Sequence, residues 1–98
     1  MWIELACQAI RQRKVLTLQY AGYVREVEAH CVGWTSVGHP VMRAGQIAGG
    51  SASGERHGWK LLRLDEATNA LITDRPSEAP RRGFKSGDKA IARIVGEI

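Results

Sequence analysis

Apolar and polar residues in the first stretch of the chain alternate with the period of a helix. Between Trp2 and Gln12, apolar side chains recur three and four positions apart, at Ile3, Ala6, Cys7 and Ile10. This spacing places them on one face of an α-helix and leaves the charged side chains on the other faces. The pattern therefore predicts an amphipathic helix over residues 2–12.

After this helix the apolar residues alternate with a period of two, which is typical of strands half buried in a sheet. Glycine-, proline- and asparagine-containing segments interrupt the alternation and indicate turns. Five short strands are predicted, over residues 15–20, 23–32, 41–48, 59–64 and 70–73. Residues 49–54 contain only glycine, serine and alanine, and this composition favours a flexible loop.

The chain ends with a second helical pattern, whose apolar positions are Ile91, Ile94, Val95 and Ile98. Ser86 and Asp88 have the character of a helix N-terminus, as an N-cap and a first-turn acid. The sequence therefore predicts a single, mostly β domain over residues 1–98, with a flanking helix at each end. Short sequential strands favour a small five-stranded antiparallel barrel or a strongly bent sheet, on which both helices pack.

Composition and charge narrow the classes of protein. With 44% hydrophobic and 24% charged residues among 98, the chain is close to the globular average, which excludes global disorder. No apolar run approaches the roughly 20 residues that span a bilayer, and no signal peptide is evident. We therefore expect a cytoplasmic protein without membrane contact. The net charge of +4, with basic residues concentrated between Arg75 and Arg93, favours an anionic partner.

Signatures of catalytic and metal sites are weak. Residues 45–51 have the glycine spacing of a phosphate loop but lack the lysine that contacts the phosphates, and no serine lies in a nucleophile elbow. The potential metal ligands lack the paired spacing of a zinc site; they are His30, Cys31, His39 and His57. We expect no enzymatic activity, no metal and no cofactor, and we interpret Cys7 and Cys31 as small buried residues.

Basic residues that interrupt the apolar strand patterns are the strongest candidates for a binding site. They are Arg25, Arg43, Lys60 and Arg63, with Tyr20 and Trp59 as flanking aromatic residues. Such residues either lie singly in solvent or converge into one cationic patch for phosphate or carboxylate. For Arg43, the alternative to ligand binding is an ion pair with Glu26 or Glu28 on a neighbouring strand.

Short motifs between about residues 5 and 95 resemble the WYL-domain family. The segment A-I-R-Q-R-K-V-L-T-L-Q-Y-A-G-Y-V-R-E-V-E-A-H has the family's helix and strand, followed by Tyr20, Gly22 and Arg25 in their expected places. The segment K-L-L-R-L-D-E-A is similar to a later family motif and places Lys60, Arg63, Leu64 and Asp65 on it. The segment R-R-G-F-K-S-G-D-K-A-I is similar to the family's C-terminal end.

The chain departs from the family pattern at three places. Val41-Met42-Arg43 replaces the tripeptide that names the family, Ala29-His30 stands where a proline is usual, and Glu66 replaces a basic residue. The resemblance implies an SH3-like (Sm-like) barrel more firmly than it implies the family's usual ligand.

The resemblance implies that the protein is a bacterial regulatory module. Family members generally sense an anionic ligand through basic residues on the barrel, in several cases single-stranded DNA or RNA or a nucleotide. They usually follow a helix-turn-helix, which does not fit before the strand starting at Val15. We therefore expect a non-enzymatic ligand-binding module that acts through a protein partner or as a homo-oligomer. The alternative is a protein-interaction or oligomerisation module without a small ligand, because open small barrels can add strands at their edges.

Overall fold

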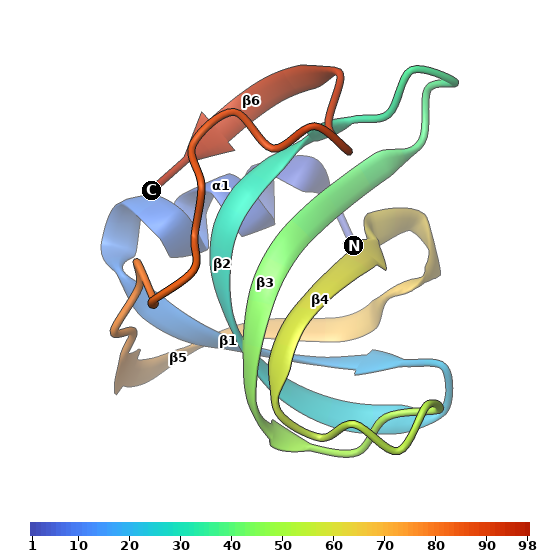
Figure 1. Cartoon of the computed structure of the whole chain (residues 1–98). Coiled ribbons are helices and arrows are strands. Elements are labelled where there is room, and N and C mark those ends of the chain that lie inside the picture. The colour runs from blue at the N-terminus through green and yellow to red at the C-terminus, as the bar shows by residue number, and fades with distance from the viewer.

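The computed structural model describes residues 1–98 and follows the predicted order of elements as far as the fifth strand (Figure 1). The elements are α1 (Ile3–Gln12), β1 (Lys14–Tyr20), β2 (Tyr23–Trp34), β3 (Pro40–Gly49), β4 (Gly58–Arg63), the 3-10 turn η1 (Leu64–Glu66), β5 (Thr68–Pro76) and β6 (Arg93–Glu97). The first helix and all five predicted strands are confirmed, because each overlaps an element of the predicted type.

The apolar face of α1 explains both its formation and its position. Ala6, Ala9 and Ile10 are buried in the main core together with side chains of the strands. Arg13 ends the helix in the left-handed conformation, with φ of 53°, and its backbone N–H is bonded to the carbonyls of the last turn. The chain therefore turns directly from α1 into β1, and the helix covers one face of the sheet.

The six strands form one antiparallel sheet in the order β4-β3-β2-β1-β5, with β6 paired to β2 beside this path. Strand β2 pairs with β1 through its first half and with β6 through its second half. The sheet bends strongly around its inner face (Figure 1). The mostly β architecture is thus confirmed.

Of the two predicted architectures, the five-stranded barrel is wrong, because the sheet has six strands and is not closed, and the strongly bent sheet is the one observed. Strands β4 and β5 lie at opposite ends of the strand order and do not pair with each other. The turn η1 lies between these two strands, and the N-terminal ammonium group donates hydrogen bonds to the backbone carbonyls of Leu64 and Ala67 there. The chain terminus thus occupies backbone acceptors at this end of the sheet.

The predicted C-terminal helix is also wrong. Residues 77–92, called the strap below, form an irregular segment with turns, and residues 93–97 are strand β6. In Figure 1 the strap crosses in front of β2, on the side of the sheet opposite α1. Gly87 directly follows the predicted N-cap Ser86 and has a φ of 71°, which a helix does not accommodate. In addition, β2 offers β6 backbone hydrogen bonds that a local helix pattern cannot reveal.

The two residues predicted to start that helix have other partners. The Ser86 hydroxyl donates a hydrogen bond to Glu97, and Asp88 forms an ion pair with Arg43. Both interactions fix the strap to the sheet rather than capping a helix.

Two apolar clusters lie on the two faces of the sheet. The larger cluster fills the inner face and contains 14 buried residues, among them Leu16, Val27 and Met42. The smaller cluster lies under the strap and consists of Cys31, Val41 and Ile91, with Phe84 packed against it. No helix of the protein has both the length and the apolar character that crossing a lipid bilayer requires.

The strap gives different roles to two isoleucines that a helix would have buried together. Ile91 is 4% exposed, whereas Ile94 is 38% exposed on β6. We expect Ile91→Ala to lower the free energy of unfolding by about 2–4 kcal/mol, and Ile94→Ala to lower it by less than about 1 kcal/mol. Urea denaturation of both variants measures the difference. Equal losses would mean that the strap does not pack as described.

Candidate anion-binding site

The predicted basic residues lie on two faces of the sheet. Successive side chains of a strand point to opposite faces. In the pairing of β3 with β4, Arg43 lies opposite Leu61, and Lys60 lies opposite the core residue Ala44. Lys60 therefore belongs to the inner side of the sheet, and Arg43 belongs to the outer side. The four basic residues do not converge at one point.

Arg25 and Tyr20 form a cluster of their own on the inner side. Arg25 is 3% exposed, and its guanidinium donates hydrogen bonds to the backbone carbonyl of Tyr20 at 3.1 and 3.3 Å and to Gln46 at 3.4 Å. The guanidinium also lies 5.1 Å from the centre of the Tyr20 ring, within the range of a cation–π contact. These contacts account for the buried charge of Arg25 within the protein.

Lys60 and Arg63 also have partners within the protein. The Lys60 ammonium group donates to the backbone carbonyl of Glu55 and to the Ser51 hydroxyl. Arg63 forms an exposed ion pair with Asp65 at 2.6 Å, and its guanidinium lies 3.8 Å from Glu66. Asp65 and Glu66 thus reduce the positive charge around Arg63.

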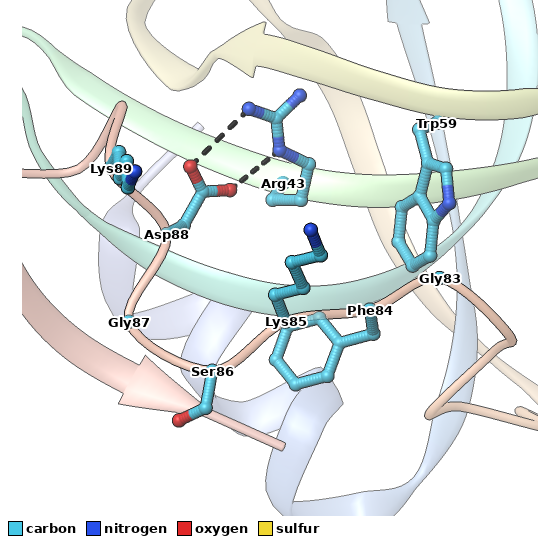
Figure 2. Close-up of a pocket in the computed structure, with 9 residues that line it drawn as sticks. All are labelled: Arg43, Trp59, Gly83, Phe84, Lys85, Ser86, Gly87, Asp88 and Lys89. Carbon is cyan, nitrogen blue, oxygen red and sulfur yellow. Dashed lines mark hydrogen bonds and ion pairs between the residues drawn. The ribbon is translucent and has the colours of Figure 1, made fainter.

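Arg43 and Trp59 are the two predicted residues that the structure brings to one cleft (Figure 2). This strap cleft has a volume of about 480 Å³ and lies between β3, β4 and strap residues 83–89. The strap adds Phe84, Lys85 and Lys89 to its lining. Sequence reasoning missed these three because Lys89 falls in the predicted C-terminal helix and Phe84 and Lys85 fall in the irregular stretch before it, and no local pattern shows that this segment folds back over the sheet.

Arg43 is held in the strap cleft by a two-point ion pair with Asp88. Its Nε lies 2.6 Å from Oδ2, and its Nη2 lies 3.3 Å from Oδ1. The hydrogen bond from Arg43 holds the pKa of Asp88 below its ordinary value, assisted by the backbone N–H of Ala90. Asp88 is therefore ionised at neutral pH, and it aligns the guanidinium in the fork geometry that also suits a phosphate.

The alternative partners considered for Arg43 are engaged elsewhere. Glu28 is paired with Arg81, and Glu26 lies 3.5 Å from Arg75. The acid that pairs with Arg43 comes from the strap, more than 40 residues along the chain, so strand pairing alone did not indicate it.

Trp59 and Phe84 line the cleft beside Arg43, and both pack against the ring of His30. The His30 ring lies edge-on to Trp59 at 4.6 Å between centres and 5.3 Å from Phe84. Nε2 of His30 accepts a hydrogen bond from the backbone N–H of Arg81, so the proton lies on Nδ1, which donates to the carbonyl of Glu28. Burial lowers the pKa of His30. Both ring nitrogens are occupied, and His30 thus fixes Trp59 and the strap rather than acting as a base.

Two further carboxylates fasten the strap. Glu28 is 1% exposed and accepts hydrogen bonds from Arg81 at 2.7 and 3.2 Å and from the backbone N–H of Glu78 at 2.6 Å. Glu97 on β6 accepts from the Ser86 hydroxyl and from the backbone N–H of Gly87. The strap, which forms one wall of the cleft, is therefore attached to the sheet on both sides of Phe84.

The strap cleft has a net positive charge even though Arg43 is paired with Asp88. Arg43 and Asp88 neutralise each other, while neither Lys85 nor Lys89 takes part in any of the six ion-pair contacts of the structure. Figure 2 shows the Lys85 ammonium group directed toward the space between Arg43 and Trp59. The cleft can therefore attract an anion and place it beside an aromatic face.

The two cysteines are both free and buried, as predicted. Burial raises the pKa of the Cys31 thiol to about 12, and the neighbouring Glu97 adds to this effect. Burial also raises the pKa of Cys7. Both thiols are therefore protonated at neutral pH and are poor nucleophiles.

Comparison of the chain with protein-family models, curated proteins and solved structures found no match. No group of three or more His, Cys, Asp or Glu side chains is placed to hold a metal ion.

Proposed function

We propose that the protein is a non-enzymatic module that binds an anionic ligand, single-stranded nucleic acid or a nucleotide-like molecule, in the strap cleft. The observation that carries this proposal is the meeting of an aligned guanidinium, two lysines without ion pairs and an indole wall in one cleft. Its volume of about 480 Å³ falls within the range of small-molecule sites, roughly 300–1,000 Å³.

The residues of the cleft suit the two parts of such a ligand. Arg43 presents nitrogens in a planar fork that matches two oxygens of a phosphate, and Lys85 and Lys89 add flexible positive charges. Trp59 offers a ring on which a base stacks without sequence preference. The Asp88 carboxylate occupies the position on the Arg43 guanidinium where a phosphate would bind, so the ligand competes with Asp88 for Arg43.

The resemblance to the WYL-domain family supports the same ligand class. We propose that the bent open sheet is an opened form of the SH3-like barrel that the resemblance implies. A cytoplasmic role in bacterial transcription regulation, exerted through a partner protein, follows from that resemblance and belongs to this proposal.

Titration of a fluorescently labelled oligothymidylate at two salt concentrations tests the proposal. Three cations in the cleft predict that the logarithm of the affinity falls with the logarithm of the salt concentration with a slope of roughly −2. An unlabelled mononucleotide added as competitor tells whether one phosphate and one base are sufficient. Absence of binding by both molecules at low salt, or an affinity independent of salt, would contradict the proposal.

A second function, protein interaction or self-assembly, is favoured by the edges of the sheet. Strands β4 and β5 each have one unpaired edge, and Leu71 on β5 is 64% exposed. Unpaired edges with exposed apolar side chains can accept a strand from another chain. Light scattering over a range of protein concentrations measures the mass. A dimer that Leu71→Lys dissociates would favour this function, and a monomer at all concentrations would exclude self-assembly.

A further inference from the structure

A second basic cleft lies along the sheet from the strap cleft, and Trp59 lines both of them. This arginine cleft has a volume of about 450 Å³. The basic side chains in its lining are His57, Arg75, Arg81 and Arg82. None of these four was among the residues predicted to form a site.

The carboxylates around the arginine cleft leave positive charge available. Glu28 is the one carboxylate in its lining, and it is buried and fully engaged by Arg81 and a backbone N–H. Outside the lining, Glu26 contacts Arg75 through one exposed pair at 3.5 Å, and Glu78 contacts Arg81 at 3.3 Å. Exposed pairs of this kind are weak and are readily exchanged for a ligand.

Two arginines of the cleft have nitrogens without a partner. Arg82 makes no side-chain hydrogen bond and no ion pair in the structure. Arg81 uses Nε and Nη2 for its carboxylates, while Nη1 donates no hydrogen bond. Buried Glu28 fixes the Arg81 guanidinium and with it this free nitrogen, and Arg82 lines the same cleft. Fixed and flexible cations in one cleft are suited to the several oxygens of a phosphate group.

We propose that the arginine cleft is a second anion site, which takes a phosphate group through Arg81, Arg82 and His57. The phosphate is either free or the terminal group of a chain that continues over Trp59 into the strap cleft. The first source is independent of the strap cleft, whereas the second rests on its proposed function.

Inorganic pyrophosphate is the probe for the site itself. In ¹⁵N-labelled protein, we expect it to shift the His57 ring and the Arg82 side-chain resonances, and we expect Arg82→Gln to weaken its affinity about tenfold, the effect of one charged hydrogen bond. The matched control is Arg11→Gln on α1, which removes the same charge from an exposed position of the helix. Equal affinities of the two variants, or no shift at millimolar pyrophosphate, would overturn the proposal.

Tetrathymidylate with and without a 5′-phosphate distinguishes the two sources. Tighter binding of the phosphorylated form that disappears in Arg82→Gln identifies a terminal phosphate. Equal binding of both forms, with pyrophosphate still bound in an Arg82-dependent manner, identifies a free phosphate. If Arg43→Ala leaves tetrathymidylate binding unchanged while Arg82→Gln weakens pyrophosphate binding as expected, the proposed function of the strap cleft fails and the arginine cleft stands.

Discussion

Replacing Glu28 with alanine is expected to lower the free energy of unfolding by about 2–4 kcal/mol, the largest loss for any single polar side chain of this protein. Glu28 is buried and accepts three hydrogen bonds that attach the strap to β2. Its removal leaves the Glu78 backbone N–H and the Arg81 guanidinium without their acceptor. Water can still reach Arg81, which is partly exposed, so the loss stays below that of a fully buried pair.

Glu26→Ala is the matched control, because Glu26 lies on the same strand two residues earlier. Its carboxylate makes a single contact with Arg75, at 3.5 Å, with both side chains exposed. We expect its replacement to change the free energy of unfolding by less than about 1 kcal/mol. Urea denaturation of the two variants gives both values, and similar losses would contradict the assignment of Glu28 as the main attachment of the strap.

The same attachments give the stability a pH dependence of defined sign. Burial raises the pKa of Glu28, but the hydrogen bonds from Arg81 and from the Glu78 backbone outweigh this effect and hold the pKa below its ordinary value. Hydrogen bonds likewise lower the pKa of Asp88, through Arg43, and of Glu97, through the Gly87 N–H. Each lowered pKa contributes stability that is present above the unfolded-state value, about 4, and is lost as the pH falls through the folded-state value.

As the pH falls, His30 contributes a loss of stability that begins at a higher pH than the loss caused by the carboxylates. Because burial lowers the pKa of His30 in the folded protein, the unfolded chain takes up a proton first as the pH falls below about 6.5. We therefore expect the free energy of unfolding to decrease below about pH 6.5 and to decrease more steeply below about pH 4. Urea midpoints measured from neutral to acid pH test this, and a stability that rises over the same range would be inconsistent with it.

Replacing Arg43 with alanine is expected to weaken binding of the anionic ligand by a factor of about ten or more. Arg43 is aligned by Asp88 and is only partly exposed, so its charge acts through less solvent than that of a surface arginine. Arg43→Lys keeps the charge but loses the planar fork, and we expect an intermediate affinity. Arg11→Ala, on the exposed side of α1, is the control for the loss of net charge and is expected to change the affinity little.

Asp88→Asn separates binding from a purely structural role of the ion pair. Both Arg43→Ala and Asp88→Asn break the same pair, so a structural role predicts that both variants weaken binding. If Asp88 instead competes with the ligand for Arg43, its neutralisation tightens binding while Arg43→Ala weakens it. Fluorescence titrations of both folded variants decide between these outcomes. Equal affinity of wild type and Arg43→Ala would mean that Arg43 serves only the ion pair.

Local patterns in the sequence were sufficient for the first three quarters of the fold. The helical spacing of Ile3, Ala6 and Ile10 and the period-two strands depend on neighbouring residues, and the structure has these elements. The C-terminal pattern of Ile91, Ile94 and Ile98 fits a helix equally well by spacing. Whether this segment forms a helix or a strand depends on pairing with the second half of β2, about 60 residues away, and no local pattern reports this pairing.

The candidate site, like the fold, was predictable from local sequence patterns only in part. Arg43 and Trp59 interrupt strand patterns and were therefore visible in the sequence, and they line one cleft. That Lys60 belongs to the other face follows from the register of β3 with β4, and the sequence does not fix that register. Lys85 and Lys89 became lining residues only because the strap folds back over the sheet.

Mapping the ligand on ¹⁵N-labelled protein by NMR tests the central claim, binding in the strap cleft, most directly. On addition of an oligothymidylate, we predict shifts of the Trp59 indole N–H, the Arg43 Nε–H and the backbone amides of residues 83–89, which line the strap cleft. Shifts confined to the inner cluster of Arg25 and Tyr20, or to the free edge of β5, would contradict the claim.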